Sequence, residues 1–298
     1  MGKIDRRRFI QTGILGAAGM VAWGATASEM SFPVVPAPTI DKVKLGNTGL
    51  IVPRVAMGTG SHGGNQQSNQ TRLGMQEFVK LARHAYDRGL QFFDMADSYG
   101  SHTFVREVLK QVPREKTTLL SKIWTADTKW AKAGPVSQTL DRFRLETGSD
   151  YFDILLMHCL MKGNWREDKK AYMDGFSEAK QKGIVKAVGV SCHNWDALKE
   201  AVEEPWVDVI LARINPFGTH MDGTPEAVMG LLETARKNGK GVIGMKIFGN
   251  GDNTSEDERE RSLNFAIRSG NVHCMTLGLE SIQQMDDAIS RVMRIARA

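Results

Sequence analysis

The sequence predicts an α/β protein that folds as a single (β/α)8 TIM barrel with an N-terminal β-hairpin. Two observations predict it. Apolar runs of four to eight residues alternate eight times with stretches of helical periodicity, and this order favours parallel strands joined by right-handed crossovers. Several helical stretches also stop at a glycine, as at Arg88-Gly89, Lys182-Gly183 and Asn238-Gly239, where a left-handed residue commonly ends a helix.

The first 27 residues have the pattern of an export signal. Arg6-Arg7-Arg8-Phe9-Ile10 is a twin-arginine pattern, a weakly apolar run covers residues 14–25, and Ala25-Thr26-Ala27 is an A-x-A cleavage site. The run is shorter than the about 20 apolar residues that a membrane-spanning helix needs. We therefore expect residues 1–27 to be a signal peptide that the twin-arginine translocase recognises, giving a periplasmic protein with no permanent membrane insertion. A leader that stays attached as an anchor is the alternative.

Residues 28–40 hold three prolines and few charges, so we predict a linker there and the barrel over residues 41–298. That length matches a barrel of about 250 residues. The leader has a net charge of +3, so the formal charge of +5 falls to +2 without it. With no basic stripe interleaved with aromatic residues, this charge does not indicate a nucleic-acid partner.

Cysteine and histidine patterns indicate no metal site. The three cysteines, Cys159, Cys192 and Cys274, have no C-x-x-C spacing, and the seven histidines have no H-E-x-x-H or similar spacing. We expect three small buried thiols, with a Cys159–Cys192 bridge as the alternative.

The predicted elements follow one another in strict alternation. A hairpin is expected at residues 44–52 (KLGNTGLIV), around Asn47-Thr48-Gly49. Strands are expected at 54–58, 91–94, 118–122, 152–158, 187–191, 207–214, 241–247 and 273–278. Helices are expected at 75–88, 104–110, 136–145, 169–182, 195–203, 225–238, 256–269 and 281–295. A doubly wound open sheet is the competing fold, but the Gly58-Thr59-Gly60 turn lacks the third glycine and the helix of a dinucleotide fingerprint.

Four polar residues lie at the ends of three successive predicted strands. Asp94 and Tyr99 lie in FFDMADSYG, Lys122 in TTLLSKIW and His158 in YFDILLMHC. Polar groups that end buried apolar strands are costly unless they pair with one another, and barrel active sites are built at the carboxyl ends of the strands. The sequence therefore predicts that these four residues converge on one mouth of the barrel.

The four side chains suit the protonation of an oxygen on which negative charge develops, as in hydride addition to a carbonyl. A phenol has a pKa of about 10, and the nearby Lys122 ammonium would favour its ionised form. Asp94 would hold Lys122, and His158 would donate a hydrogen bond to the carbonyl oxygen. A lyase or isomerase that uses Lys122 as a Schiff-base amine is disfavoured, because it needs a lysine free of a carboxylate partner.

With these motifs in view, the chain resembles the aldo-keto reductases. The resemblance runs from VKLGNTGLIVPRVAMGTG to LGLESIQQMDDAI and rests on FDMADSYG, LLSKIW and YFDILLMH. It implies Tyr99 as general acid, Lys122 and Asp94 as partners that tune it, and His158 as the residue that orients a small carbonyl substrate. The strands GMKIFGNG and CMTLGLES are similar to a branch whose members often append a ferredoxin-like segment, and no cysteine cluster follows here.

The resemblance also implies a noncovalent nicotinamide cofactor, NAD or NADP, across the barrel mouth. It assigns cofactor contacts to Gly58, Ser191, Asn194, Ile247, Gly249, Gly251, Gly278, Glu280 and Asp287. Departures from the family pattern are Cys192 after the carboxamide-binding serine, Ile214 where an aromatic ring stacks on nicotinamide, and Asp287 in place of an adenine-contacting asparagine. Glu280 occupies the position of an Arg or Lys that binds the 2′-phosphate of NADP, so NAD is slightly favoured. A Glu that merely favours a helix N-terminus is the alternative.

Substrate specificity is expected in the loops after the strands, with Trp124, Trp165 and Phe217 as candidate wall residues. The leading interpretation is an oxidoreductase that transfers a hydride between a nicotinamide cofactor and a carbonyl or alcohol. The alternative is a nicotinamide-binding barrel with little turnover that acts as a sensor or partner-binding subunit, which the altered positions Cys192, Ile214 and Glu280 leave open.

Overall fold

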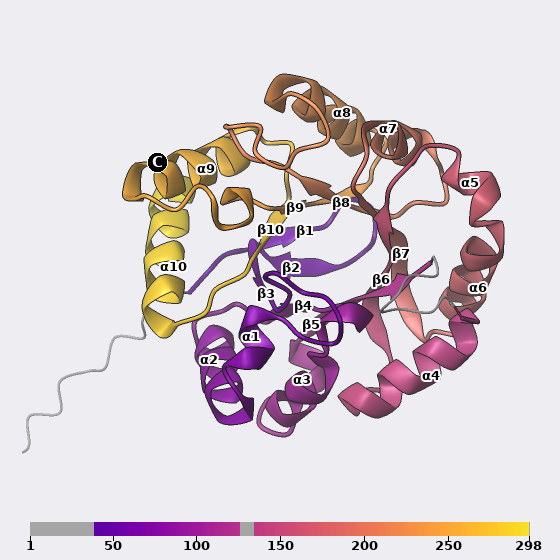
Figure 1. Cartoon of the computed structure of the whole chain (residues 1–298), viewed down its shortest axis with the longest axis horizontal. Coiled ribbons are helices and arrows are strands. Elements are labelled where there is room, and N and C mark those ends of the chain that lie inside the picture. Colours follow the sequence, from indigo (N-terminus) through magenta and orange to yellow (C-terminus); the bar gives the residue numbers. More distant parts are fainter. Residues whose placement is uncertain (1–38, 126–133, 298) are drawn as a thin grey trace, which may run out of the picture. The chain divides into compact units, whose positions relative to one another are not determined.

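The computed structural model describes residues 39–125 and 134–297. Eight parallel strands close into a barrel in the order β10-β3-β4-β5-β6-β7-β8-β9, and helices surround them (Figure 1). The predicted (β/α)8 fold is confirmed. The signal peptide and nearly all of the linker, predicted at residues 1–40, lie outside the described residues.

The barrel strands and the helices have these bounds. The strands are β3 (Val55–Gly58), β4 (Phe92–Asp94), β5 (Thr118–Trp124), β6 (Phe152–Leu160), β7 (Val185–Cys192), β8 (Val209–Arg213), β9 (Gly241–Met245) and β10 (Cys274–Leu277). The helices are α1 (Asn69–Arg72), α2 (Met75–Asp87), α3 (His102–Leu109), α4 (Val136–Thr147), α5 (Trp165–Asp168), α6 (Lys170–Gln181), α7 (Trp195–Glu203), α8 (Pro225–Lys237), α9 (Glu256–Arg268) and α10 (Ile282–Arg297).

The predicted hairpin is also confirmed. Strands β1 (Lys42–Lys44) and β2 (Ile51–Pro53) pair antiparallel. The Asn47 amide donates over 2.7 Å to the carbonyl of Gly239, which lies two residues before β9. Leu45 and Val52 are fully buried and join the apolar cluster inside the barrel. The hairpin therefore packs against the amino-terminal end of the barrel.

The strands bury two separate apolar cores, because successive side chains face opposite sides of a strand. One core lies between strands and helices. The other fills the barrel and includes Phe92, Leu120 and Leu156. Two residues beyond each of these, on the same face, come Asp94, Lys122 and His158. The period of two thus carries the polar residues to the inside of the barrel at its carboxyl end.

Two short helices and several strand ends differ from the sequence expectations. Strands β5 and β6 each run two residues further than predicted, to Trp124 and Leu160. The short helices α1 and α5 were not predicted, because four residues are too few to show a 3.6-residue period. Strand β9 ends at Met245, two residues early, because Lys246 has a φ of 56°, in the left-handed region. Among the described residues, no helix is both long enough and apolar enough to cross a membrane.

Candidate active site

Lys122 and Asp94 form an ion pair inside the barrel mouth. The side chains are 1% and 8% exposed. The Lys122 ammonium also donates to the Met95 carbonyl at 2.9 Å, and the second carboxylate oxygen of Asp94 accepts from Thr276 Oγ1 at 2.8 Å. Both charges are therefore paired and hydrogen-bonded, as a buried pair must be to avoid a large desolvation cost.

Tyr99 lies directly above this pair. It ends a 3₁₀ turn, Asp97–Tyr99, that Gly100 terminates in a left-handed conformation. Lys122 Nζ is 4.9 Å from the centre of the phenol ring, and the hydroxyl is 3.5 Å from His158 Nε2. All four predicted catalytic residues are thus brought together at the carboxyl end of the barrel.

The pKa of Tyr99 is raised above its usual value, chiefly by burial, and the Lys122 ammonium acts in the opposite direction. The expectation that lysine alone would make this phenol unusually acidic is incomplete, because desolvation outweighs the attraction here. The consequence is a hydroxyl that keeps its proton at neutral pH, as a proton donor must.

His158 is neutral at the mouth. Burial and then the positive charge of Lys122 lower its pKa well below its usual value. Its ring meets the Trp124 ring edge-on, with the ring centres 5.2 Å apart. The Nδ1 atom of His158 is buried without a hydrogen-bond partner among the described residues. A neutral imidazole beside the phenol can orient an oxygen without competing for the proton.

Two glycines make room for Tyr99. A β-carbon on Gly60 would overlap the phenol ring, and one on Gly63 would lie 2.5 Å from ring carbon Cδ1, closer than real contacts allow. The glycine-rich turn after β3, which is an imperfect dinucleotide fingerprint in the sequence, therefore serves here to pack the tyrosine.

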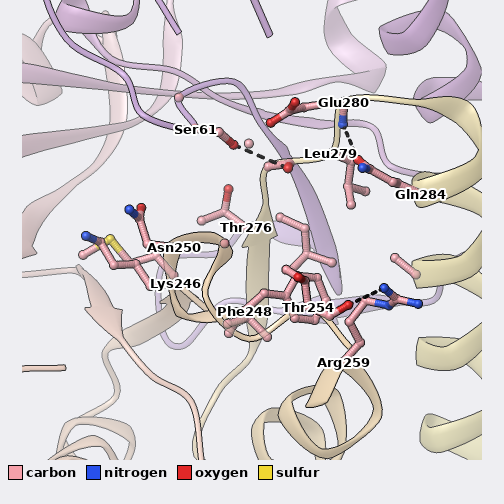
Figure 2. Close-up of a pocket in the computed structure, with 18 of the residues that line it drawn as sticks. Ser61, Lys246, Phe248, Asn250, Thr254, Arg259, Thr276, Leu279, Glu280 and Gln284 are labelled. Atoms are coloured by element: carbon pink, nitrogen blue, oxygen red, sulfur yellow. Dashed lines mark hydrogen bonds between the residues drawn. The ribbon is translucent and has the colours of Figure 1, made fainter. Parts of the chain in front are cut away.

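A cleft of about 480 Å³ runs from Tyr99 along the loops after β3, β9 and β10 to helix α10. Figure 2 shows its walls, with Glu280 and Gln284 on one side and Phe248 and Thr254 on another. Of the residues predicted to contact the cofactor, the following line it: Gly58, Ile247, Gly251, Gly278, Glu280 and Asp287.

The other predicted cofactor residues lie outside this lining. Ser191 is fully buried on the inner face of β7, and its hydroxyl has no partner within the described chain. Asn194 caps helix α7 by accepting from the amides of Asp196 and Ala197, so its oxygen is occupied. Gly249 is buried, and a β-carbon there would overlap the Asn253 side chain.

Besides Asp94, two acidic residues line the cleft, and both are held by neighbours. Glu280 Oε1 accepts from Asn69 Nδ2 at 2.8 Å, which links β10's loop to helix α1. Asp287 accepts from Arg291 Nε at 2.9 Å and pairs with Arg259 at 3.3 Å.

Of the three candidate substrate-binding residues, only Trp124 lies at the barrel mouth. Trp124, partly buried, contacts His158 at the mouth. Trp165 is 1% exposed, and its indole donates to the Ala197 carbonyl, so it is a core residue that offers no wall to a substrate. The Phe217 ring stacks on the Arg261 guanidinium, with 4.7 Å between the ring centre and Arg261 Cζ. Phe217 does not line the cleft.

Sequence reasoning missed several cleft residues, namely Lys246, Arg259, Thr276, Gln284 and Arg291. The sequence indicated only one of these contacts, the Asp287–Arg291 pair, because oppositely charged residues four apart on a helix lie side by side. Within residues 39–125 and 134–297, no group of three or more His, Cys, Asp or Glu side chains could hold a metal ion. The three cysteines are free thiols.

Comparisons with known proteins agree with this geometry. The chain is 29% identical to the oxidoreductase YtbE of Bacillus subtilis over 139 residues, 43% of this chain and 46% of that protein. It is 24% identical to the NADH-specific methylglyoxal reductase of Escherichia coli over 220 residues, 66% of this chain and 64% of that protein. Less than two thirds of either relative is therefore covered.

The structure also matches solved ones. PA4992 of Pseudomonas aeruginosa superimposes with a TM-score of 0.70 at 19% identity, over 87% of this chain and 98% of that one, which supports the fold. The model of the aldo/keto reductase family matches residues 54–297, nearly all of the described barrel. The chain therefore belongs to the aldo/keto reductase family.

Proposed function

We propose that the protein transfers a hydride between a nicotinamide cofactor and a small carbonyl or alcohol, with Tyr99 as the general acid. The observation that carries this proposal is the convergence of the Tyr99 hydroxyl, the buried Lys122–Asp94 pair and neutral His158 at one end of the cleft. Packing alone does not explain two buried charges and two aromatic polar groups gathered at one point.

In the direction of reduction, the Tyr99 hydroxyl gives its proton to the carbonyl oxygen as the hydride reaches the carbonyl carbon. Lys122 stabilises the phenolate that remains, and Asp94 holds the ammonium in position. His158 donates a hydrogen bond to the same oxygen. General acid catalysis of this kind typically contributes 10²–10⁴-fold to the rate.

The residues of the cleft suit a nicotinamide cofactor, which would supply the hydride. Outside the cleft lining, on the inner face of β7, Ser191 carries a buried hydroxyl with no protein partner in the described chain, and we propose that it binds the carboxamide. Glycines 58, 251 and 278 allow close backbone approach along the cleft. We favour NAD over NADP, because Glu280 would repel a 2′-phosphate. The NADH specificity of the Escherichia coli relative is consistent with this choice.

We also propose that the chain is exported through the twin-arginine route, which carries folded proteins, and that it leaves the cytoplasm with its cofactor bound. The support is the Arg6-Arg7-Arg8 pattern with its apolar run and A-x-A site. Replacing all three arginines by lysine is expected to leave the protein in the cytoplasm on cell fractionation. Native periplasmic protein that carries no nucleotide would contradict loading before export.

Titration of the purified protein with NADH and NADPH, followed by intrinsic fluorescence, tests the proposal. We expect saturable binding of NADH, tighter than that of NADPH, and consumption of NADH with members of a panel of aldehydes and ketones. Failure to bind either nucleotide would reject the function. Binding without turnover of any carbonyl would favour a sensor or partner-binding role.

A further inference from the structure

Lys246 is a cation without a counter-ion at the edge of the active-site cleft. Its side chain has no ion pair or hydrogen bond within the described chain, although it is only partly exposed and lines the cleft. Most of the surface lysines in the described part of the barrel, by contrast, pair with a carboxylate, as Lys237 does with Glu233.

A second cation lies beside it. Arg213 ends strand β8 and pairs in register with Met245, the residue before Lys246. Arg213 forms an ion pair with Asp222, whose side chain is completely buried, and its Nε has no partner in the described chain. Asp222 is therefore in direct contact with Arg213 and acts on Lys246 only through space, so Lys246 has no ion pair of its own in the described chain.

The backbone at Lys246 is held in an unfavourable conformation. Its φ of 56° is one that glycine adopts more easily. Its carbonyl accepts from the Gly249 amide at 2.9 Å and from Asn215 Nδ2 at 3.2 Å, which fixes it. Strain that the surroundings maintain at a cleft is a reason to look for function.

The positive charges around Lys246 lower the pKa values of neighbouring groups. Burial and then Arg213 lower the pKa of Lys246. Burial, Arg213, Lys246 and Lys122 together lower the pKa of His193 to about 3. A cleft lined by uncompensated positive charge concentrates anions.

Lys246 faces the half of the mouth that carries His158. It interacts with Cys159, which lies in β6 next to His158, with Arg213 at the end of β8, and with Asp222 in the loop after β8. In Figure 2, Lys246 and Asn250 lie at the opposite end of the cleft from Gln284 and Arg259. Glu280 and Asp287, which are matched to the adenosine part of a cofactor, lie at the same end of the cleft as Gln284 and Arg259.

We propose that Lys246, with Arg213 behind it, binds an anionic group of the substrate, so that the protein prefers carbonyl compounds that carry a carboxylate. This inference rests on the proposed carbonyl reductase function. Asp222 is the positioning residue, since it holds Arg213 and the loop after β8 in place.

A matched pair of aldehydes tests the proposal. The wild-type protein and the variants Lys246→Met and Lys246→Arg would be assayed with 4-carboxybenzaldehyde and with 4-methylbenzaldehyde, which differ in charge. Lys237→Met, on the exposed face of α8, removes the same charge far from the cleft and is the control. Dissociation constants for NADH and NADPH would be measured on every variant.

We expect Lys246→Met to lower kcat/KM for the carboxylated aldehyde by about 10- to 100-fold, as for loss of a charged hydrogen bond, mainly through KM. The neutral aldehyde, both nucleotide affinities and the Lys237→Met protein are expected to change less than about threefold. Lys246→Arg is expected to retain most of the preference.

Three results would overturn the inference: no change in Lys246→Met, an equal loss for both aldehydes, or a loss of nucleotide affinity, which would assign the lysine to the cofactor's pyrophosphate. Should wild-type protein bind neither nucleotide and reduce neither aldehyde, the proposed function fails on its own. Calorimetric binding of 4-carboxybenzaldehyde to wild-type and Lys246→Met protein would then still test Lys246.

Discussion

Gly60 packs so closely against Tyr99 that any β-carbon at position 60 would overlap the phenol ring. The turn after β3 and the 3₁₀ turn after β4 therefore pack against each other. The position of the Tyr99 hydroxyl is thus set by the backbone at Gly60 and not by a flexible side chain. Precise aim matters, because a misplacement of about 1 Å can cost 10²-fold in rate.

Gly60→Ala is accordingly expected to lower kcat by at least about tenfold, because the ring has to shift from its place beside Lys122 and His158. The measurement is steady-state reduction of the best carbonyl substrate. Gly64→Ala is the matched control, since a β-carbon on Gly64 meets no atom within 4 Å, and it should keep wild-type kcat. Equal activity of the two variants would refute the argument.

Tyr99→Phe removes the proposed proton donor and keeps the ring. We expect kcat for carbonyl reduction to fall by about 10²–10⁴-fold, while the dissociation constant for nucleotide stays within about threefold. Tyr86→Phe, in helix α2 and outside the cleft, is the control. A Tyr99→Phe protein that keeps more than about a tenth of the activity would exclude this phenol as the general acid.

Lys122→Met leaves the carboxylate of Asp94 buried without its ammonium. Urea unfolding is expected to show a loss of about 3–5 kcal/mol in the free energy of unfolding. The double variant Lys122→Met, Asp94→Asn should lose clearly less than the two single variants together, since no unpaired charge remains. Strict additivity would mean that the two residues do not act as a pair.

Stability is expected to depend on pH through the buried histidines. Burial holds the pKa of His193 at about 3 and that of His158 well below its usual value. Below about pH 6.5, the unfolded chain binds protons that the folded protein cannot, so stability is complete above that pH and falls as the pH drops. The slope is up to about 1.4 kcal/mol per pH unit for each histidine.

The measurement is the urea midpoint between pH 7.5 and pH 5, in wild-type protein and in His193→Gln. The variant should show a shallower decline, because it lacks one of the groups that resist protonation. Parallel curves for the two proteins would show that His193 titrates normally in the folded state.

Glu280→Lys is expected to shift the ratio of NADPH to NADH affinity by about tenfold toward NADPH, equal to about 1.4 kcal/mol, because an ammonium replaces a carboxylate in the cleft. Fluorescence titration measures both dissociation constants. Glu226→Lys makes the same charge change on exposed α8 and should leave the ratio unaltered. An unchanged ratio in Glu280→Lys would put the adenosine end of the cofactor elsewhere.

The barrel and the four residues at its mouth could be predicted from two features of the sequence. These are the alternation of strands with helices and the position of the polar residues within the strands. A polar residue near the carboxyl end of an apolar strand, two residues after an inward-facing apolar one, faces the barrel mouth, which is why Asp94, Lys122 and His158 lie where the sequence indicates. The hairpin at Asn47-Thr48-Gly49 was equally local, since turn residues alone specify it.

Residues in long loops could not be predicted in the same way. Trp165 begins α5 and turns into the core, where its indole reaches the Ala197 carbonyl, and no local pattern distinguishes this from a loop residue that faces a substrate. Lys246 faces the cleft only because its backbone adopts a left-handed conformation, which depends on hydrogen bonds from Asn215 and Gly249. Such tertiary contacts leave no periodic trace in the sequence.

The β1–β2 hairpin has a consequence for access to Tyr99. Leu45 and Val52 pack against the apolar residues that fill the barrel, so its amino-terminal end is closed. The proposed nucleotide and carbonyl would therefore share a single entrance, at the carboxyl end of the strands.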